Sequence, residues 1–268
     1  MDEGAIVMTF RSRHAATVAL AFFCAAFPAI ARGDEPTAAA VDLEKTLQAA
    51  DEAIRQNPKS AEAYLDRAHI RMQQKALDSA LADLEEAIRL DPKSVTAYAG
   101  RGMCFCLKGD LDRALEDFET VIRLHPDHGG ALANRGAVWM KKNQYDKAMD
   151  DFNEAIRIDP RDALAHGNRG WTWHLKQDDE RAILDLNEAI RLDSELLMAY
   201  LNRGAIWLKK GECDKAVVDF NAAVRLCPTE PLAHGGRSES SLWLGKFADA
   251  IAAANETIRL GLKIPRIF

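Results

Sequence analysis

Residues 129–162 read GGALANRGAVWMKKNQYDKAMDDFNEAIRIDPRD, and this 34-residue pattern recurs along most of the chain. With Ala61 as position 1 of the first copy, six copies continue in register to about residue 260. Position 20 is alanine in every copy, and position 8 always holds a small residue. Position 32 holds Pro92, Pro126, Pro160 and Pro228 in four of the first five copies, and Ser194 in the fourth. Pro58 lies 34 residues before Pro92 and continues the series. Self-similarity at a fixed period of this length indicates a repeat architecture.

Each copy is predicted to form two helices, at positions 1–14 and 18–31, joined by a short turn. Because a helix turns by about 100° per residue, positions 4, 8 and 11 share one face of the first helix. Positions 17, 20, 24, 27 and 30 form the apolar stripe of the second helix in the same way. Small residues at positions 8 and 20 let the two helices approach closely, and large residues at positions 11 and 24 fill the space beside them. The proline at position 32 cannot continue the second helix.

The packing pattern, the proline at position 32 and the tyrosines at position 4 (Tyr64, Tyr98 and Tyr200) resemble the tetratricopeptide repeat family. This resemblance covers about three quarters of the chain. It implies an all-α, right-handed superhelical solenoid of helix-turn-helix repeats that serves as a protein-binding scaffold. The predicted repeats are 61–94, 95–128, 129–162, 163–196, 197–230 and 231–260. The chain departs from the family pattern at position 7, where arginine replaces leucine, and in the last repeat, where Ala254 replaces a larger residue.

The first 31 residues have the composition of a secretory signal. Arg11 and Arg13 precede an uncharged apolar run that ends at Ala31 and is short for a membrane-spanning helix. We therefore expect a signal peptide that is cleaved after Ala31, and export to the periplasm or the extracellular space. The alternative is an uncleaved anchor, which would place the protein at a membrane, and translation from Met8 would give a cleaner basic segment.

The two ends of the repeat array are predicted to differ. Residues 32–40 are expected to form a linker, and residues 41–58 fit the second half of a repeat, which would cap the N-terminal end as an unpaired helix. Residues 261–268 form a C-terminal tail with no polar capping helix, although a terminal repeat usually needs a solvated outer face. Either the tail folds back over the last repeat or that end meets a partner. Association of copies through this end would give a homo-oligomer.

Charge and composition argue against several classes of function. Acidic and basic residues are mixed along the chain, with a formal net charge of -6, and no Lys/Arg cluster suited to a phosphate backbone is present. A nucleic-acid partner is therefore not expected. His125 and His128 lie in one turn without a third ligand nearby, so neither a metal nor another cofactor is expected.

The cysteines are predicted to be buried or half-buried thiols. Cys104 and Cys106 are two residues apart on one predicted helix and point in different directions, so they cannot bridge. Cys213 and Cys227 lie near opposite ends of another predicted helix, about 20 Å apart at the helical rise per residue. A long-range or intermolecular pair is the remaining alternative.

Charged residues recur with the repeat. Position 7 is arginine in all six copies, and position 23 is aspartate in the first five, which predicts an ion pair between the two helices of each of these repeats. Ala253 removes the pair in the sixth. Position 29 is also arginine, in the last turn of each second helix, where a cation favours the negative end of the helix dipole.

Function is predicted to lie on the opposite face of the first helices, at positions 2, 5, 6, 9, 12 and 13, which line the concave groove of a superhelix. Many of these residues are Met, Leu or Trp, which is typical of an interaction surface. The alternative is a tight superhelix that buries this face against itself. The candidate binding residues are Met103, Asn134, Met140, Lys141, Asn168, Trp171, His174, Leu201, Asn202, Lys209 and Trp243.

Three of these candidates form a ladder, because Asn134, Asn168 and Asn202 all stand at position 6. An asparagine amide can donate to and accept from one peptide unit, so a row of them can hold an extended chain by its backbone. The arrangement resembles the asparagine ladder in the repeat region of O-linked N-acetylglucosamine transferase. No glycosyltransferase domain follows here, so the resemblance implies a mode of binding and no catalysis.

The sequence as a whole predicts a scaffold or adaptor that binds an extended peptide or a partner subunit in the groove and is not an enzyme. The chain contains no phosphate-binding glycine motif, nucleophile elbow or HExxH helix. The alternatives are a structural protein that self-associates through its C-terminal end and a membrane-anchored assembly factor.

Overall fold

A computed structural model describes residues 38–261 of the chain, with side chains from Leu43 onward. Within this range the chain forms thirteen helices and no strand. The described residues fall into two compact units, which are called the N-terminal unit (38–160) and the C-terminal unit (161–261). The predicted signal peptide, most of the predicted linker and all but the first residue of the predicted tail lie outside the described residues. Among residues 38–261, no helix is both long and apolar enough to cross a membrane.

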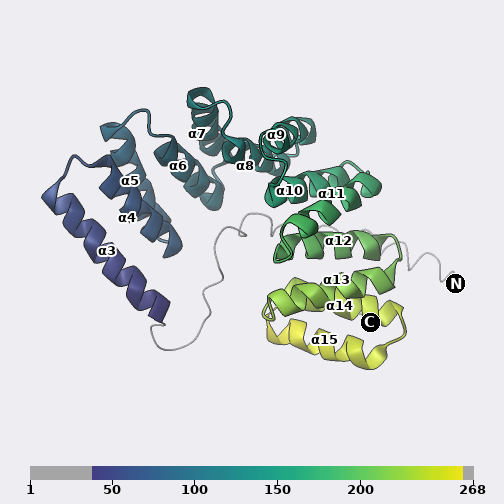
Figure 1. Cartoon of the computed structure of the whole chain (residues 1–268). Coiled ribbons are helices and arrows are strands. Elements are labelled where there is room, and N and C mark those ends of the chain that lie inside the picture. Colours follow the sequence, from purple (N-terminus) through teal and green to yellow (C-terminus); the bar gives the residue numbers. More distant parts are fainter. Residues whose placement is uncertain (1–37, 262–268) are drawn as a thin grey trace. The chain divides into compact units, whose positions relative to one another are not determined.

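The N-terminal unit consists of an unpaired helix followed by three helix pairs, arranged as successive hairpins (Figure 1). Each helix contacts the next along the chain. The helices are α3 (Ala38–Gln56), α4 (Ala61–Gln73), α5 (Leu77–Leu90), α6 (Val95–Lys108), α7 (Leu111–Leu124), α8 (Gly129–Lys141) and α9 (Tyr145–Ile158). Because α3 begins at Ala38, the last three residues of the predicted linker belong to a helix.

The C-terminal unit contains three more pairs built in the same way, and Figure 1 shows them stacked in chain order. The helices are α10 (Ala163–Leu175), α11 (Asp179–Leu192), α12 (Leu197–Lys209), α13 (Cys213–Leu226), α14 (Pro231–Trp243) and α15 (Phe247–Arg259). The prediction of an all-α repeat solenoid is therefore confirmed.

The second helix of each repeat begins at position 17, one residue earlier than predicted. The cause is the turn residue at position 15, which adopts the left-handed conformation in every repeat and reverses the chain within three residues. The six residues with φ between 58° and 81° are Lys75, Gly109, Asn143, Gln177, Gly211 and Gly245. The sequence did not indicate this requirement, because only three of the six are glycine.

Close packing of the two helices within a repeat depends on position 8, as predicted. A Cβ atom added at Gly136 would lie 2.8 Å from the Phe152 ring at position 24, and one added at Gly170 would lie 3.0 Å from Leu186. Position 20 contributes an alanine that is buried in every repeat. A larger residue at position 8 would therefore force the helices apart.

The predicted Arg–Asp pairs are confirmed in the first five repeats. In each pair the guanidinium donates two hydrogen bonds to one carboxylate, as in Arg135 Nη2 to Asp151 Oδ1 at 2.7 Å and Arg135 Nε to Asp151 Oδ2 at 2.9 Å. The other four pairs, with the same geometry, are Arg67–Asp83, Arg101–Asp117, Arg169–Asp185 and Arg203–Asp219. The aspartates are buried and the arginines half-buried, so each pair locks two helices of one repeat together.

The arginine at position 7 also reaches the preceding repeat. Arg67 Nη1 donates to Asp51 Oδ1 at 2.7 Å, and Arg203 Nη1 donates to Asn187 Oδ1 at 2.6 Å. Both acceptors stand at position 25 of the preceding second helix. One guanidinium thus joins three helices of two successive repeats.

The other recurring arginine, at position 29, pairs with a glutamate three residues before it in most helices, as in Arg89–Glu86 and Arg157–Glu154. Thr120 and Ala222 replace this glutamate before Arg123 and Arg225. In the described structure Cys104, Cys106 and Cys227 are free thiols, and Cys104 and Cys106 are buried as predicted.

Candidate binding face

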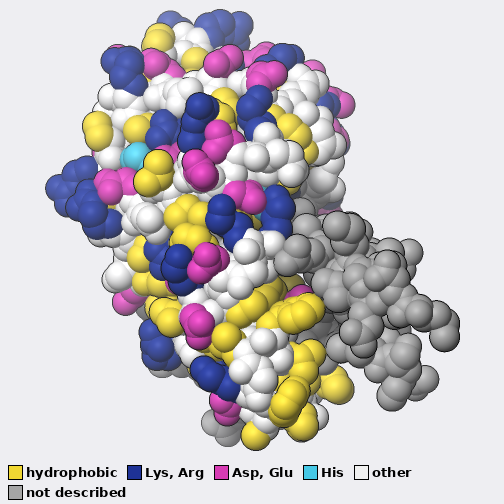
Figure 2. Space-filling model, turned by 90° about the vertical axis from the view of Figure 1, so that its right-hand side faces the viewer, with side chains coloured by type: hydrophobic (Ala, Val, Ile, Leu, Met, Phe, Trp, Pro, Cys, Tyr) yellow, Lys and Arg dark blue, Asp and Glu magenta, His cyan; other side chains and the backbone are white. Residues whose placement is uncertain are grey.

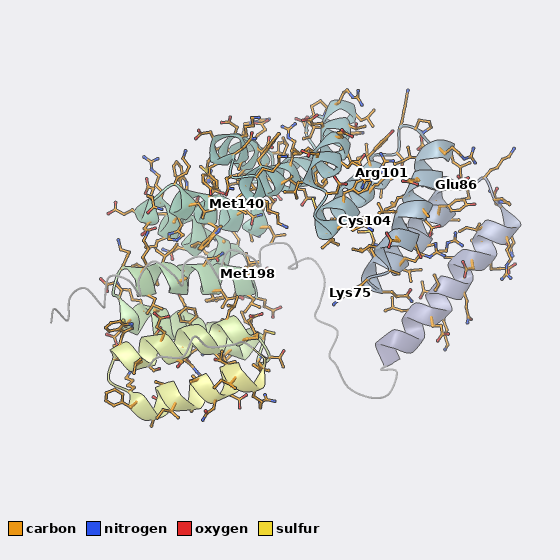
Figure 3. All side chains as sticks on the ribbon, turned by 180° about the vertical axis from the view of Figure 1, so that it is seen from behind. Lys75, Glu86, Arg101, Cys104, Met140 and Met198 are labelled. Atoms are coloured by element: carbon orange, nitrogen blue, oxygen red, sulfur yellow. The ribbon has the colours of Figure 1, made fainter. Side chains whose placement is uncertain are left out.

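The predicted binding residues lie on the first helices of the repeats. In the N-terminal unit α4 contacts α6 and α6 contacts α8, and in the C-terminal unit α10 contacts α12 and α12 contacts α14. Figure 3 marks Met140 on α8 and Met198 on α12. The first helices of each unit therefore lie side by side, and the surface that they share is called the first-helix face.

The three asparagines of the ladder have different surroundings. Asn134 on α8 belongs to the N-terminal unit, whereas Asn168 on α10 and Asn202 on α12 belong to the C-terminal unit. Asn134 and Asn168 are half-buried. Asn202 is 0% exposed, and neither its Oδ1 nor its Nδ2 atom has a hydrogen-bond partner.

Position 6 lies at the joint between successive repeats, which explains the burial of Asn202. A Cβ atom added at Gly100 would lie 3.0 Å from Leu84, and one added at Gly236 would overlap the Phe220 ring. Both glycines stand at position 6, and both contacted residues stand at position 24 of the preceding repeat. By the same register, the Asn202 side chain starts above Leu186, which is itself fully buried.

Most of the apolar candidates in the C-terminal unit are enclosed in this structure. Trp171 on α10 and Leu201 on α12 are buried, and Leu201 packs with Met198 and Phe220 in one apolar cluster. Trp243 at the end of α14 is the exception, because 55% of it is exposed. The sequence left open whether this face is open or closed against itself. Over α10 and α12 the structure encloses Trp171, Leu201 and Asn202 but leaves Leu164 and Lys209 exposed.

In the N-terminal unit the candidates are more mixed. Met140 is buried, Met103 is half-buried and packs beside the cluster formed by Ala68, Leu84 and Cys104, and Lys141 is exposed. Met140 and Met103 therefore contribute to packing, whereas Lys141 is accessible to a ligand. Their role in binding stays a prediction.

A polar cluster distinguishes the fourth repeat from the others. His174 Nδ1 lies 2.5 Å from Asp179 Oδ1, and Lys209 Nζ of the next repeat lies 2.9 Å from Asp179 Oδ2. The Trp171 and His174 rings are 4.7 Å apart. Asp179 stands at position 17, where the second, third and fifth repeats have the half-buried residues Leu111, Tyr145 and Cys213. This carboxylate therefore links α10, α11 and α12.

Burial lowers the pKa of His174, although its hydrogen bond with Asp179 acts in the opposite direction. Burial raises the pKa of Asp179, but the hydrogen bonds from His174 and Lys209 outweigh it and lower the pKa overall. At neutral pH the pair is therefore an imidazole that donates from Nδ1 to a carboxylate. The same geometry can orient a catalytic base, but here both groups are nearly enclosed and their third partner is a structural lysine.

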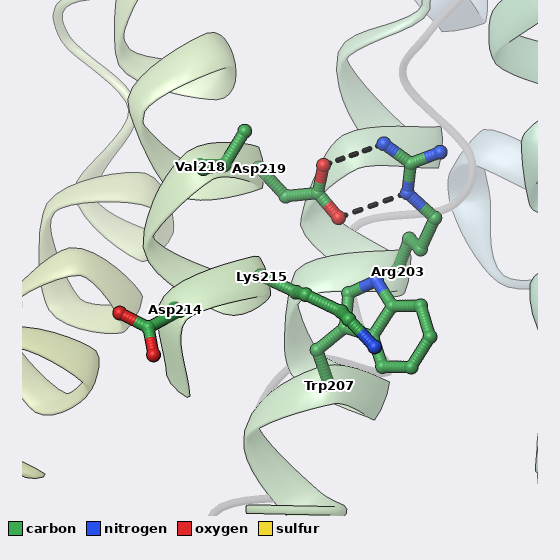
Figure 4. Close-up of a pocket in the computed structure, with 6 residues that line it drawn as sticks. All are labelled: Arg203, Trp207, Asp214, Lys215, Val218 and Asp219. Atoms are coloured by element: carbon green, nitrogen blue, oxygen red, sulfur yellow. Dashed lines mark hydrogen bonds and ion pairs between the residues drawn. The ribbon is translucent and has the colours of Figure 1, made fainter. Parts of the chain in front are cut away.

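A shallow surface cavity of about 300 Å³ lies between α12 and α13 (Figure 4). It is lined by the Arg203–Asp219 pair and by Lys215, whose Nζ atom lies 4.4 Å from the centroid of the Trp207 ring. The same cation–aromatic contact joins positions 19 and 11 in the other three middle repeats: Arg113 over Phe105, Lys147 over Trp139 and Arg181 over Trp173. A feature that recurs with the repeat belongs to the scaffold, so this cavity is not a specific ligand site.

Residues 38–261 contain no group of three or more His, Cys, Asp or Glu side chains placed to hold a metal ion. A family model described as tetratricopeptide repeat matches residues 38–106 and 108–163. Over these residues the chain belongs to the tetratricopeptide repeat family.

Solved structures of tetratricopeptide repeat proteins share the fold with this chain. One chain of the APC/C Cut9–Hcn1 hetero-tetramer has a TM-score of 0.77 at 18% identity, covering 82% of this chain and 44% of its own. This protein thus spans less than half of that chain. A tetratricopeptide repeat protein from Parabacteroides merdae has a TM-score of 0.67 at 18% identity, covering 83% of this chain and 88% of its own.

YrrB, described as having an unusual peptide-binding site, has a TM-score of 0.51 at 24% identity, with 70% of this chain and 96% of its own covered. A comparison with curated protein sequences found no match. At these identities the similar structures establish the tetratricopeptide repeat fold alone.

Three recurring positions that organise this scaffold were not predicted. Position 3 is alanine in all six repeats and is buried in all six. Position 19 supplies the cation of the aromatic contact, and position 25 supplies the acceptor for the arginine of the next repeat. Position 3 could have been found from its invariance, because an alanine kept at one place in every copy indicates close helix packing.

Proposed function

We propose that this protein is a non-catalytic scaffold that binds an extended polypeptide through the first-helix face, with the Asn168 and Asn202 amides as the polar contacts in the C-terminal unit. The tetratricopeptide repeat fold supports a role in protein–protein interaction.

The observation that carries the proposal is the unpartnered amide of Asn202. A buried donor or acceptor without a partner costs about 1–3 kcal/mol in desolvation. Asn202 has one of each, both enclosed at the joint between the fourth and fifth repeats. In the free protein this amide makes no hydrogen bond, so an apolar residue at position 202 would be more stable. A ligand that completes the hydrogen bonds of the amide is therefore the best explanation for Asn202.

A peptide unit supplies the complementary pair of groups. Asn202 Nδ2 would donate to a peptide carbonyl, and Oδ1 would accept from a peptide N–H, which is how one amide holds an extended backbone. Since the side chain is enclosed in the present structure, binding requires the joint between α10 and α12 to open slightly. YrrB, which shares this fold and is described as a peptide-binding protein, lends support to a peptide as the ligand.

The proposal is tested by screening the full chain against a library of short unstructured peptides and measuring the affinity of the best binder by fluorescence anisotropy. Asn202→Ala should weaken binding by about tenfold, which corresponds to about 1.4 kcal/mol. Asn221→Ala on α13 is the matched control, because this half-buried amide lies on a second helix of the same unit. Equal affinities of the wild type and both variants would remove Asn202 from the site.

We also propose that the protein is exported, on the basis of the composition of residues 1–31, which lie outside the described residues. Intact mass of the protein recovered from the periplasm or the medium of a bacterial host gives the test. A mass that begins at Arg32 supports cleavage after Ala31, and an unprocessed chain in the cytoplasm contradicts it.

A further inference from the structure

The last second helix leaves an apolar stripe uncovered. Phe247, Ile251 and Ile258 on α15 are 64%, 62% and 61% exposed. They stand at positions 17, 21 and 28 and therefore share one face of the helix. Leu242, near the end of α14, is 44% exposed beside them. Figure 2 shows hydrophobic side chains gathered at the end of the C-terminal unit where α14 and α15 lie.

The same positions are covered in the preceding repeats. At position 21, Leu115 on α7 and Met149 on α9 are buried, and at position 12, Met72 and Cys106 are buried where Leu242 is exposed. No residue at position 17, 21 or 28 of α3, α5, α7, α9, α11 or α13 is classed as exposed. The stripe on α15 is therefore a repeat-stacking surface that has no following repeat among the described residues.

The internal joints show what this surface accepts. Each first helix carries alanine at position 3, arginine at position 7 and a small or β-branched residue at position 10. At the joint between the fourth and fifth repeats, the apolar cluster that contains positions 3 and 10 of α12 also contacts Ile183 and Ile190, at positions 21 and 28 of α11. Ala199 and Ile206 of α12 pack in this way with Leu186 of α11. The arginine at position 7 reaches the residue at position 25 of the covered helix, as Arg203 reaches Asn187.

On α15 the residue at position 25 is Asn255, which is exposed and stands beside the apolar stripe. The surface thus offers an apolar strip together with the acceptor that an arginine would use at an internal joint. Apolar burial and this hydrogen bond are the two contacts that the occupant must supply.

Within the described residues, a second copy of the chain does not offer these contacts at its N-terminal end. The first helix α4 is already covered by α3, and the outward residues of α3 are polar, among them Glu44, Lys45, Gln48 and Glu52, all of which are exposed. Head-to-tail stacking of copies would therefore place charged residues on Phe247, Ile251 and Ile258.

We propose that the α15 surface binds an amphipathic helix of another protein that carries a small residue, an arginine and a short apolar residue at positions i, i+4 and i+7. The helix would dock as a following first helix does, with its arginine on Asn255 and its small residue above Ala254. This surface is centred on the second helix α15, and only Leu242 at its edge belongs to the first-helix face, so the proposal does not depend on the function proposed above.

The probe is a peptide copied from α4, residues 60–74, because it contains Ala63, Arg67 and Ile70 in the required spacing. A hydrocarbon link that joins residues 62 and 66 of the peptide keeps the peptide helical. Both of these residues, Glu62 and Asp66, are exposed in α4. Its binding to the full chain is followed by fluorescence anisotropy. We expect saturable binding that is weakened at least tenfold by Ile251→Asp in the protein or by Arg67→Glu in the peptide.

The matched control is Leu184→Asp on α11, because Leu184 is a 68% exposed apolar residue away from this surface, and it should leave binding unchanged. Failure of the wild-type chain to bind the peptide, or equal binding by Ile251→Asp, overturns the proposal. So does a dimer that Ile251→Asp abolishes, because a second copy would then occupy the surface. If the peptide binds to the Phe268→Asp variant of the full chain but not to the wild type, the C-terminal tail occupies the surface, and the proposal is overturned.

Discussion

At the scale of single residues, the arginine at position 7 is the most heavily used side chain of the scaffold. Its guanidinium holds the aspartate of its own repeat in two hydrogen bonds and reaches position 25 of the preceding one. Hydrogen bonding to Asp117 raises the pKa of Arg101, with smaller contributions from the charges of Asp117 and Glu85, the latter at position 25. The charge of Arg101 is therefore fixed at every accessible pH.

A double-mutant cycle on Arg135 and Asp151 measures the strength of one pair. Each single alanine variant leaves a half-buried or buried charge unpaired, so we expect a coupling free energy of about 1–3 kcal/mol in urea unfolding. The exposed pair Arg157–Glu154 on α9 is the control, and its coupling should be much smaller. A cycle on Arg135 and Asp151 with no coupling would contradict the structural role of the pair.

Asn202→Leu separates a binding amide from a structural one. Leucine has the same number and branching of side-chain heavy atoms as asparagine and needs no hydrogen bonds, so the free protein should become more stable by about 1 kcal/mol. Asn202→Ala leaves a cavity and should be less stable than Asn202→Leu. Thermal and urea unfolding give the measurement. Equal losses in both variants would mean that the amide makes stabilising hydrogen bonds in solution.

The buried cysteines should be chemically inert in the native protein. Burial raises the pKa of Cys104 to about 11 and that of Cys106 to about 12. The thiolate is the reactive form, and at pH 8 its fraction at a pKa near 11 is on the order of 0.1%. We expect a thiol reagent at pH 8 to modify Cys227 first in native protein and Cys104 and Cys106 only in denaturant, as followed by peptide mapping. Rapid native labelling of Cys106 would contradict this expectation.

At the scale of helices and turns, Ser194 interrupts the series of prolines without changing the backbone. Asp193 before it has φ −137° and ψ 101°, close to the values of Asp91 before Pro92, φ −130° and ψ 91°. The residue before a proline favours this extended region. The Ser194 amide donates no hydrogen bond to any described residue, so proline would remove none.

Ser194→Pro should therefore stabilise the protein by about 0.4–1 kcal/mol, because proline lowers the entropy of the unfolded chain. Ser194→Ala is the control and should change stability little. The midpoint of thermal unfolding is the measurement. A lower midpoint for Ser194→Pro would show that the fourth turn differs from the others in solution.

Helix pairs, their packing positions and the Arg–Asp pairs could be predicted because each depends on residues within one repeat. The small size of Gly136 and the large size of Phe152 predict their contact, and the opposite charges of Arg135 and Asp151 predict theirs. Alanine at position 3 gives no such contrast within one repeat, since a small apolar residue is compatible with either face of a helix, and only its recurrence in all six repeats marks it. The left-handed residue at position 15 was missed because Lys75 and Gln177 carry no sign of it.

At the scale of the whole chain, the sequence of a repeat does not determine what covers it. Asn134, Asn168 and Asn202 share one position and one residue type, yet only Asn202 is fully enclosed. The difference comes from the neighbouring repeats, whose side chains vary. For the same reason the sequence could place the candidate binding residues on the first helices but could not say which of them are accessible.

Position 21 offers the sharpest test of this dependence on neighbours. Leu115 and Ile251 occupy it in the second and sixth repeats, but Leu115 is 7% exposed and Ile251 is 62% exposed. An aspartate at residue 115 would bury a charge without a partner, so Leu115→Asp should cost several kcal/mol, on the order of 3 or more. Ile251→Asp should change the free energy of unfolding by less than about 0.5 kcal/mol, as surface substitutions usually do. Urea unfolding of the two variants gives the comparison, and a large loss for Ile251→Asp would show that the end of α15 is covered within the free chain.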